Sequence, residues 1–177
     1  MSRLPPRRLS VAPMLDWTDR HFRYMARQIT ENAWLYSEMI NAGAIIYGDK
    51  DRFLMFNEGE QPVALQLGGS DPSDLAKAAK AAEEYGYNEV NLNCGCPSPR
   101  VQKGSFGACL MNEVGLVADC LNTMQDAVDI PVTVKHRIGV DRQTEYGVAA
   151  EFVGTLYEKT ACRTFIVHAR NAWLDGL

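Results

Sequence analysis

Short apolar segments alternate with amphipathic segments along almost the whole chain, and this alternation constrains the fold more than any other feature. Residues with strand periodicity occupy 9–14, 33–39, 61–67, 89–94, 130–137 and 164–170. Segments with helical periodicity follow most of them. Repeated strand–helix units predict a parallel sheet with its helices on the outside, which leaves two candidates: a doubly wound sheet and a (β/α)8 barrel.

The expected helices carry recognisable start and stop signals. Thr18 is expected to cap a helix that runs to Ile29 and buries Phe22, Met25, Ala26 and Ile29. Asp71 and Pro72 begin a second helix, which buries Leu75, Ala78, Ala79 and Ala82 and ends at Gly86. A third helix is expected after Asn112, with a stripe of Val114, Val117, Leu121, Met124 and Val128, and a fourth is expected from about 144 to 159.

The polar residues of the strands favour the barrel. They share one parity along each strand and lie near its C-terminal end, whereas the other parity is apolar. In a (β/α)8 barrel one parity faces the lumen, and active sites lie at the C-terminal rim. No Gly-x-Gly-x-x-Gly follows the first strand, which argues against a dinucleotide-binding sheet. The predicted rim residues are Gln66, Asn91, Asn93, Lys135, Arg137, His168 and Arg170.

The chain is expected to form about the first six units of such a barrel. Its 177 residues suffice for one sizeable core, so residues 1–177 are interpreted as one partial TIM-barrel domain with no second domain. The hydrophobic share of 46% and charged share of 23% are those of an ordinary soluble domain. No apolar run approaches the roughly 20 residues that span a membrane, so no membrane association is expected.

One cysteine stands apart from the other four. Cys96 follows a glycine and precedes a proline at a strand end, which is a suitable position for a reactive side chain. Cys94 has the apolar parity of Leu92. The odd count and scattered spacing indicate reduced thiols, and Cys94-Gly95-Cys96 lacks the spacing of structural zinc sites, so no metal is expected. The remaining cysteines are interpreted as small core residues: Cys109, Cys120 and Cys162.

Charge alone does not indicate a nucleic-acid partner. The formal net charge is −4, whereas an RNA-binding surface is expected to be basic. Arg3, Arg7 and Arg8 form a short basic arm at the N-terminus, which is interpreted as a solvated tail.

Several rim residues are of the types that hold a flavin. A flavin needs a backbone platform, donors to its pyrimidine carbonyls and a cation near N1. Residues 13–15, Gln66, Lys135 and His168 supply such groups. Taken singly, each is more often structural, so the argument depends on their convergence at one rim.

Specific motifs resemble the tRNA-dihydrouridine synthases, and their A-type subfamily in particular. The family's Asn-x-Asn-x-Gly-Cys-Pro motif is matched at Asn91, Asn93, Gly95, Cys96 and Pro97. The segments 16–21, 135–139 and 168–174 resemble A-type signatures, and the similarity covers essentially the whole chain.

The resemblance implies a function and a set of site residues. Cys96 would be the proton donor, Asn93 would contact the RNA, and Arg137 and Arg170 would hold substrate, although barrel ion pairs remain an alternative for the two arginines. The implied reaction is NADPH-dependent reduction of D-loop uridines, at 20/20a, to dihydrouridine on tRNA. The family further implies a cytoplasmic, monomeric full-length protein with a C-terminal helical RNA-binding domain, which this chain lacks. The residues implied to bind FMN are Pro13, Met14, Leu15, Gln66, Lys135 and His168.

Two alternatives remain open. The first is another FMN-dependent barrel reductase that acts on a small molecule, such as a dihydroorotate or enoate reductase. The second is an inactive fragment without cofactor. Reduction of a free pyrimidine would support the first, and a flavin spectrum would exclude the second.

Overall fold

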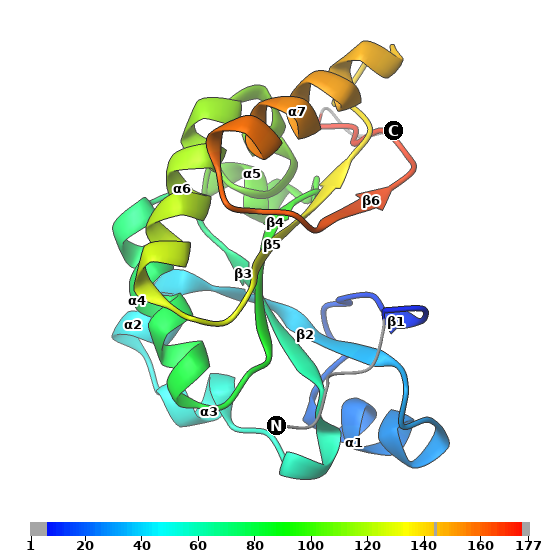
Figure 1. Cartoon of the computed structure of the whole chain (residues 1–177), viewed down its shortest axis with the longest axis vertical. Helices are drawn as coiled ribbons and strands as arrows, with labels where there is room; N and C mark the ends of the chain where they lie inside the picture. Colours follow the sequence, from blue (N-terminus) through cyan, green and yellow to red (C-terminus); the bar gives the residue numbers. More distant parts are fainter. Residues whose placement is uncertain (1–6, 144, 175–177) are drawn as a thin grey trace.

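The computed structural model describes residues 7–143 and 145–174. Its six strands are all parallel and pair in sequence order, β1 to β6. The sheet curls around a lumen, and β1 and β6 form its two unpaired edges (Figure 1). The fold is therefore α/β, a partial TIM barrel, as predicted. The strands are β1 (Ser10–Val11), β2 (Trp34–Asn41), β3 (Val63–Gly68), β4 (Glu89–Cys94), β5 (Val132–Arg137) and β6 (Phe165–His168).

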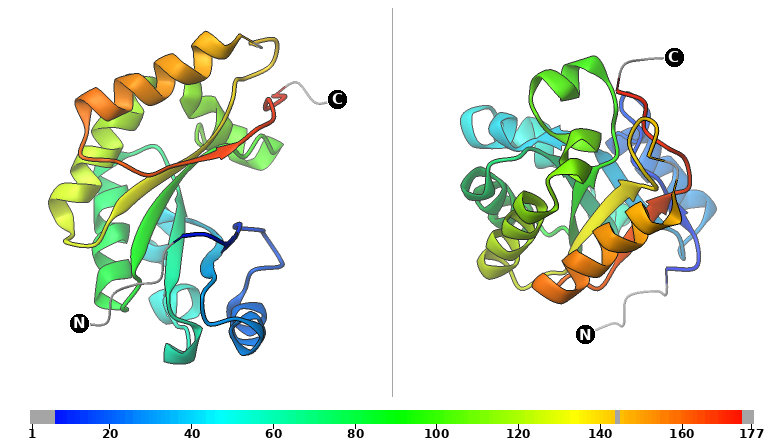
Figure 2. Two further views of the ribbon diagram at one scale, coloured as in Figure 1. Left: turned by 45° about the vertical axis from the view of Figure 1, so that its right-hand side comes forward. Right: turned by 90° about the horizontal axis from the view of Figure 1, so that it is seen from above.

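The helices cover the convex side of this sheet (Figure 2). The α-helices are α1 (Arg20–Ile29), α2 (Ala42–Tyr47), α3 (Lys50–Leu54), α4 (Pro72–Glu84), α5 (Pro99–Lys103), α6 (Val114–Ala127) and α7 (Tyr146–Lys159), and the 3₁₀ helices are η1 (Glu58–Glu60) and η2 (Gly107–Asn112). The segments α2, α3, η1, α5 and η2 are additions to the sequence prediction. No helix of the described residues has the length and apolarity that crossing a membrane would require.

The hydrophobic core lies between the strands and the helices. Leu65, Leu92 and Val134 point outward from neighbouring strands and are fully buried. They belong to one cluster with Leu75 of α4 and Leu121 of α6. Burying a leucine side chain fully contributes about 1.5–3 kcal/mol. The predicted parity is therefore confirmed for β3, β4 and β5, whose outward apolar positions pack against the helices.

The start of α1 and its buried face differ from the prediction. Asp19, rather than Thr18, is the N-cap, and its Oδ1 accepts from the Phe22 amide at 2.8 Å. Met25 and Ile29 are 54% and 78% exposed, whereas Arg23 and Arg27 are buried beside Ala26. Hydrophobic periodicity missed this face because it treats every arginine as a surface residue.

The two buried arginines of α1 have partners that explain their position. Arg23 Nε lies 2.8 Å from Glu60 Oε2, and an Arg23 Nη donates to the Thr18 carbonyl at 2.7 Å. Arg27 donates to the carbonyls of Glu60 and Pro62. A guanidinium group that satisfies carbonyl and carboxylate oxygens can be buried without an unpaired charge.

Two other helix boundaries need correction. Glu113, rather than Asn112, occupies the cap position of α6, and no side chain caps that helix. Val128 lies just beyond the helix end, where it is buried. The helix predicted from about 144 begins at Tyr146, and residue 144 itself lies outside the described residues.

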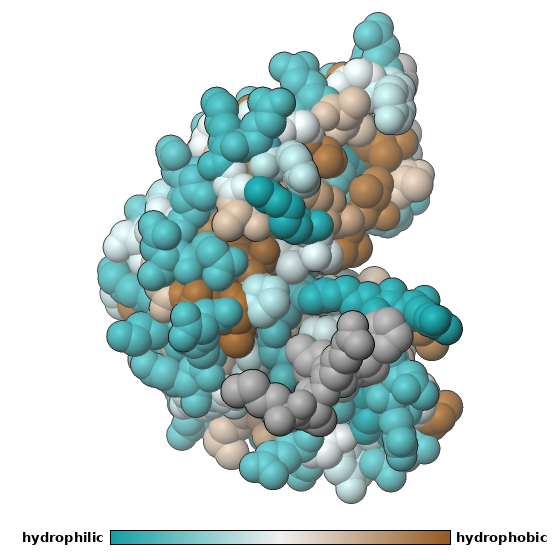
Figure 3. All heavy atoms as spheres, in the orientation of Figure 1, coloured by the Kyte–Doolittle hydropathy of each residue, from teal (hydrophilic) through white to brown (hydrophobic). Residues whose placement is uncertain are grey.

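The open side of the barrel forms a visible hollow. In the space-filling view, a notch separates the β6 and α7 part from the β1 and α1 part (Figure 3). Apolar side chains gather over β6 and α7 beside it. Val167, on the outward parity of β6, is 50% exposed, unlike the equivalent residues of the inner strands. The lumen is thus accessible from one side.

Candidate active site

The Cys96 turn lies directly after β4 and is held by hydrogen bonds on both flanks. The Gly95 and Cys96 amides both donate to Asn93 Oδ1 at 3.0 Å. The Cys96 carbonyl accepts from the Ala108 amide at 2.9 Å. Gly107 has φ +71°, and a Cβ there would lie 2.5 Å from the Cys96 carbonyl oxygen, so only glycine fits. The loop after Cys96 therefore folds back to support it.

The two cysteines of this motif have different surroundings, as the outward parity of Cys94 and the turn at Gly95 predict. Cys94 is fully buried in the core, and burial raises the pKa of its thiol. Cys96 is half-buried, with its Sγ 3.6 Å from Ser98 Oγ. Of the other three, Cys120 and Cys162 are core residues as predicted, whereas Cys109 is only half-buried. Cys96 is therefore the cysteine that lies at the rim of the barrel, directly after β4.

Three amide side chains form a buried layer in the lumen beneath this turn. Gln66 Nε2 donates to Asn91 Oδ1, and Asn93 Nδ2 donates to Gln66 Oε1, both at 2.8 Å. Each of Gln66 and Asn93 retains one amide N–H beyond these bonds. Asn91 likewise keeps one N–H beyond its bond to Thr133 Oγ1, so each of the three amides can still donate once.

Three cationic side chains, Lys135, Arg137 and Arg170, gather with His168 at the ends of β5 and β6. Arg137 pairs in register with His168, and Asn93 pairs in register with Lys135. The pKa of Lys135 is lowered by burial and then by Arg137, and the pKa of Arg137 is lowered by burial and then by Arg170. These effects identify one shared patch of positive potential beside Cys96.

The individual cations differ in how firmly they are held. Arg137 Nε donates to the Gly95 carbonyl at 2.9 Å, which ties it to the Cys96 turn. His168 and Arg170 are exposed. Burial lowers the pKa of His168, and the neighbouring cations add to this effect. Arg137 therefore has a structural contact in addition to any contact with a ligand.

The turn after β1 carries Pro13, Met14 and Leu15 on the same rim. Met14 exchanges hydrogen bonds with the buried Thr18, whose Oγ1 accepts from the Met14 amide at 2.9 Å and donates to the Met14 carbonyl at 3.1 Å. The Asp16 amide donates to Glu38 Oε1 at 2.6 Å, and Asp16 has φ +64°. The turn is thus rigidly built, and β2 separates it from the strand of Gln66.

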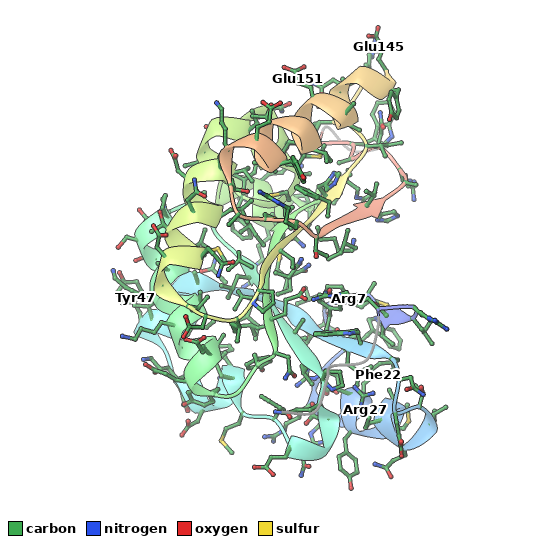
Figure 4. All side chains as sticks on the ribbon, viewed as in Figure 1. Arg7, Phe22, Arg27, Tyr47, Glu145 and Glu151 are labelled. Carbon is green, nitrogen blue, oxygen red and sulfur yellow. The ribbon has the colours of Figure 1, made fainter. Side chains whose placement is uncertain are left out.

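Sequence reasoning missed the residues that support the site from below and from the side. Arg7 is not a solvated residue, because it forms an ion pair with the buried Glu89 and stacks on Trp34 at 4.1 Å. Figure 4 labels Arg7 on the concave side of the sheet. Arg8 is exposed, and Arg3 lies outside the described residues. The sequence does contain one signal for this contact, because Glu89 has the lumen-facing parity of β4 and a carboxylate there needs a cationic partner.

Gln102 is a second support that the sequence did not indicate. Its Nε2 donates to the carbonyls of Pro97 at 2.8 Å and Leu174 at 2.7 Å. It therefore joins the Cys96 loop to the segment that follows β6. Within residues 7–143 and 145–174, no three His, Cys, Asp or Glu side chains converge as a metal site would require.

The sequence profile of the dihydrouridine synthases matches residues 10–173, which include every predicted site residue. The chain belongs to the dihydrouridine synthase family. Curated relatives named tRNA-dihydrouridine(20/20a) synthase are found in Vibrio vulnificus (62% identical over 170 residues), Yersinia pestis (61% over 173) and Escherichia coli K12 (59% over 170). These alignments cover 96%, 98% and 96% of this chain and 52%, 50% and 49% of the relatives.

This dihydrouridine synthase chain therefore spans about half the length of the curated relatives that it matches. The matched half is the one that contains Cys96 and the amide layer. The open sheet edges at β1 and β6 agree with a barrel of which these residues form only a part.

Proposed function

We propose that residues 1–177 are the N-terminal part of the FMN-binding catalytic barrel of a tRNA-dihydrouridine synthase, with no second domain among them. The proposed reaction is reduction of the C5–C6 double bond of uridines 20/20a in the tRNA D-loop, with NADPH as the reductant. The relatives are named tRNA-dihydrouridine(20/20a) synthase, which supports the same assignment for this chain. We propose that the enzyme acts as a monomer in the cytoplasm.

One observation carries the proposal: a half-buried thiol lies on the lumen rim among cations, while the neighbouring thiol is buried in the core. Cys96 is held by Asn93 and faces the patch of Lys135 and Arg137. Cys94 is fully buried. A reduction that places a proton on a bound ring needs one such accessible acid.

The residues at the rim fit a flavin. The free N–H groups of Gln66 and Asn93 are donors, which match carbonyl oxygens of a flavin or of uracil. Lys135 is a half-buried cation without a described carboxylate partner, which suits stabilisation of a reduced, anionic ring. Residues 13–15 supply a backbone platform. When bound, FMN supplies the hydride that reaches C6 of uracil.

The other residues then act on the substrate and on the proton. Cys96 gives its proton to C5 of the ring, which completes the reduction. Asn93 offers its remaining N–H to the uridine, while Arg137 and Arg170 attract the RNA phosphates or the uracil carbonyls. A uridine in folded tRNA lies within base stacks, so it must be extruded to reach this rim.

The proposal is tested in a chimera that is as long as the curated relatives. In this protein, called the completed chimera, the chain is followed by the C-terminal half of the Vibrio vulnificus relative. Dihydrouridine is measured on tRNA that lacks modifications. Cys96→Ala should lower kcat by about 10²–10⁴, the usual contribution of general acid catalysis, while flavin absorbance stays unchanged.

Cys94→Ala is the matched control, since it removes the same atom two residues away. It should change kcat by less than a few-fold. If Cys94→Ala abolished turnover and Cys96→Ala did not, the assignment of the proton donor would be wrong. If the completed chimera reduced free uridine as well as tRNA, the small-molecule reductase would be the better interpretation.

A further inference from the structure

A carboxylate lies at the floor of the lumen, at the opposite end from Cys96. Glu89 is the first residue of β4 and is fully buried. Its Oε1 accepts from Thr133 Oγ1 at 2.6 Å and from the Tyr36 hydroxyl at 3.0 Å, and its Oε2 forms an ion pair with Arg7. None of the roles proposed above uses these residues.

A continuous chain of hydrogen bonds leads from Glu89 to the Cys96 turn. It passes from β4 to β5, back to β4, to β3 and again to β4. The successive bonds are Thr133 Oγ1 to Glu89 Oε1 (2.6 Å), Asn91 Nδ2 to Thr133 Oγ1 (2.9 Å), Gln66 Nε2 to Asn91 Oδ1 (2.8 Å), Asn93 Nδ2 to Gln66 Oε1 (2.8 Å), and the Gly95 and Cys96 amides to Asn93 Oδ1 (3.0 Å each).

Chemistry at both ends fixes the direction of this chain. An ionised carboxylate can only accept, so the Thr133 hydroxyl must donate to Glu89 and is left to accept from Asn91. At the other end the two backbone N–H groups can only donate, so Asn93 Oδ1 must accept. Both ends impose the same orientation on the three amides between them. The chain therefore has one direction.

This direction determines what the amide layer offers to a ligand. In the observed orientation Gln66 and Asn93 each retain an N–H. If the amides were reversed, both backbone N–H groups at the turn would face an amide nitrogen and would lose their acceptor. The Glu89 carboxylate excludes this reversal from a distance of four hydrogen bonds.

We propose that Glu89 and Thr133 are positioning residues, which hold the Cys96 turn and the donor orientation of Gln66 through this chain. The inference rests on the proposed function only in assigning a catalytic role to Cys96. Because the groups are buried, each bond polarises the next, and loss of one link weakens the others.

The test removes one link with an isosteric change. Thr133→Val deletes the hydroxyl and keeps the shape, whereas Thr133→Ser keeps the hydroxyl. Hydrogen exchange of the Gly95 and Cys96 amides is measured by NMR on the 177-residue chain without flavin or RNA. Thr133→Val should raise both rates by on the order of tenfold, the effect of about one lost hydrogen bond, and Thr133→Ser should restore them.

Thr160→Val is the matched control. Thr160 is also buried, donates to the Leu156 carbonyl at 2.7 Å and accepts from the Cys162 amide at 3.1 Å, but it lies outside the chain of bonds. It should leave the Gly95 and Cys96 rates unchanged. Equal rates in wild type and Thr133→Val, or an equal rise in Thr160→Val, would overturn the proposal.

Two further measurements keep the inference separate from the proposed function. Glu89→Gln replaces the charged acceptor by a neutral one and should raise the same two exchange rates, which tests the chain even if Thr133→Val does not fold. In the completed chimera, Thr133→Val should lower kcat more than it changes KM. Faster exchange with unchanged kcat would support the hydrogen-bond chain and would refute its contribution to catalysis, while the role of Cys96 is tested separately by Cys96→Ala.

Discussion

Alkylation by iodoacetamide should distinguish the five cysteines by their accessibility, with Cys96 reacting first. Cys96 is half-buried at the rim, whereas Cys94, Cys120 and Cys162 are buried. Cys94 is in the same motif as Cys96 and differs from it mainly in the burial of its side chain. The pair therefore tests the orientation of β4 directly.

The expected size of the difference follows from the burial of Cys94. Its side chain is 0% exposed within the main core, so the reagent can reach it only after β4 opens locally. If that opening costs about 4 kcal/mol, which lies between the cost of fraying and that of global unfolding, Cys94 should react about 10³ times more slowly than an accessible thiol. Burial also raises the pKa of Cys94, which lowers its thiolate population further.

Cys109 provides an internal comparison. It is half-buried like Cys96, but burial and the nearby carboxylates of Asp141 and Glu113 raise the pKa of its thiol. It should react more slowly than Cys96 and faster than the three buried cysteines. Mass spectrometry of the digested chain after timed alkylation at pH 8 gives all five rates in one experiment. If Cys94 reacted within tenfold of Cys96, the assignment of Cys94 to the core would be refuted.

Three other substitutions test separate parts of the structure. In the completed chimera loaded with FMN, Lys135→Met should lower the flavin midpoint potential by about 30 mV for each 1.4 kcal/mol of lost stabilisation, and an unchanged potential with intact FMN binding would contradict the role of Lys135. Burial lowers the pKa of His136 below 6.5. Below pH 6.5 the unfolded chain therefore binds a proton that the folded chain does not, and the free energy of unfolding should fall by up to about 1.4 kcal/mol for each pH unit of acidification. His136→Leu should flatten that slope between pH 7.5 and 5.5 in urea titrations, and equal slopes would contradict the cause. Glu60→Ala should cost about 3–5 kcal/mol of unfolding free energy because it leaves Arg23 buried and unpaired, and a loss below about 1 kcal/mol in urea titrations would count against that pair.

The sequence was sufficient to predict the strands, their order and the side of β3, β4 and β5 that faces the lumen. Period-two alternation identifies the two faces of a strand, and the segments around Gln66, Asn93 and Lys135 alternate clearly. Repeated strand–helix units then restrict the connections to parallel ones. These signals are local, so a single sequence contains them.

The errors concern interactions between distant residues. Nothing near Arg7 in sequence indicates that Glu89, 82 residues later, is its partner. Likewise, hydrophobic periodicity places Arg23 and Arg27 on the surface, because only the folded chain brings Glu60 and Pro62 beside them. The sequence predicts Thr18 as the cap of α1, but its hydroxyl bonds to Met14, and Asp19 caps the helix instead.

The net charge of −4 does not describe the electrostatic field at the barrel rim. At the floor, the pair with Glu89 raises the pKa of Arg7 although burial alone would lower it, so this carboxylate is neutralised where it lies. Lys135 and Arg137 at the rim have no carboxylate within ion-pair distance among the described residues, and their pKa values are lowered by burial and by nearby cations. Charges of one sign that cluster at the ends of β5 and β6 concentrate the field there for an incoming ligand, whatever the net charge of the chain. An anionic ligand that approaches the rim therefore meets an excess of positive charge that the acidic residues elsewhere do not cancel.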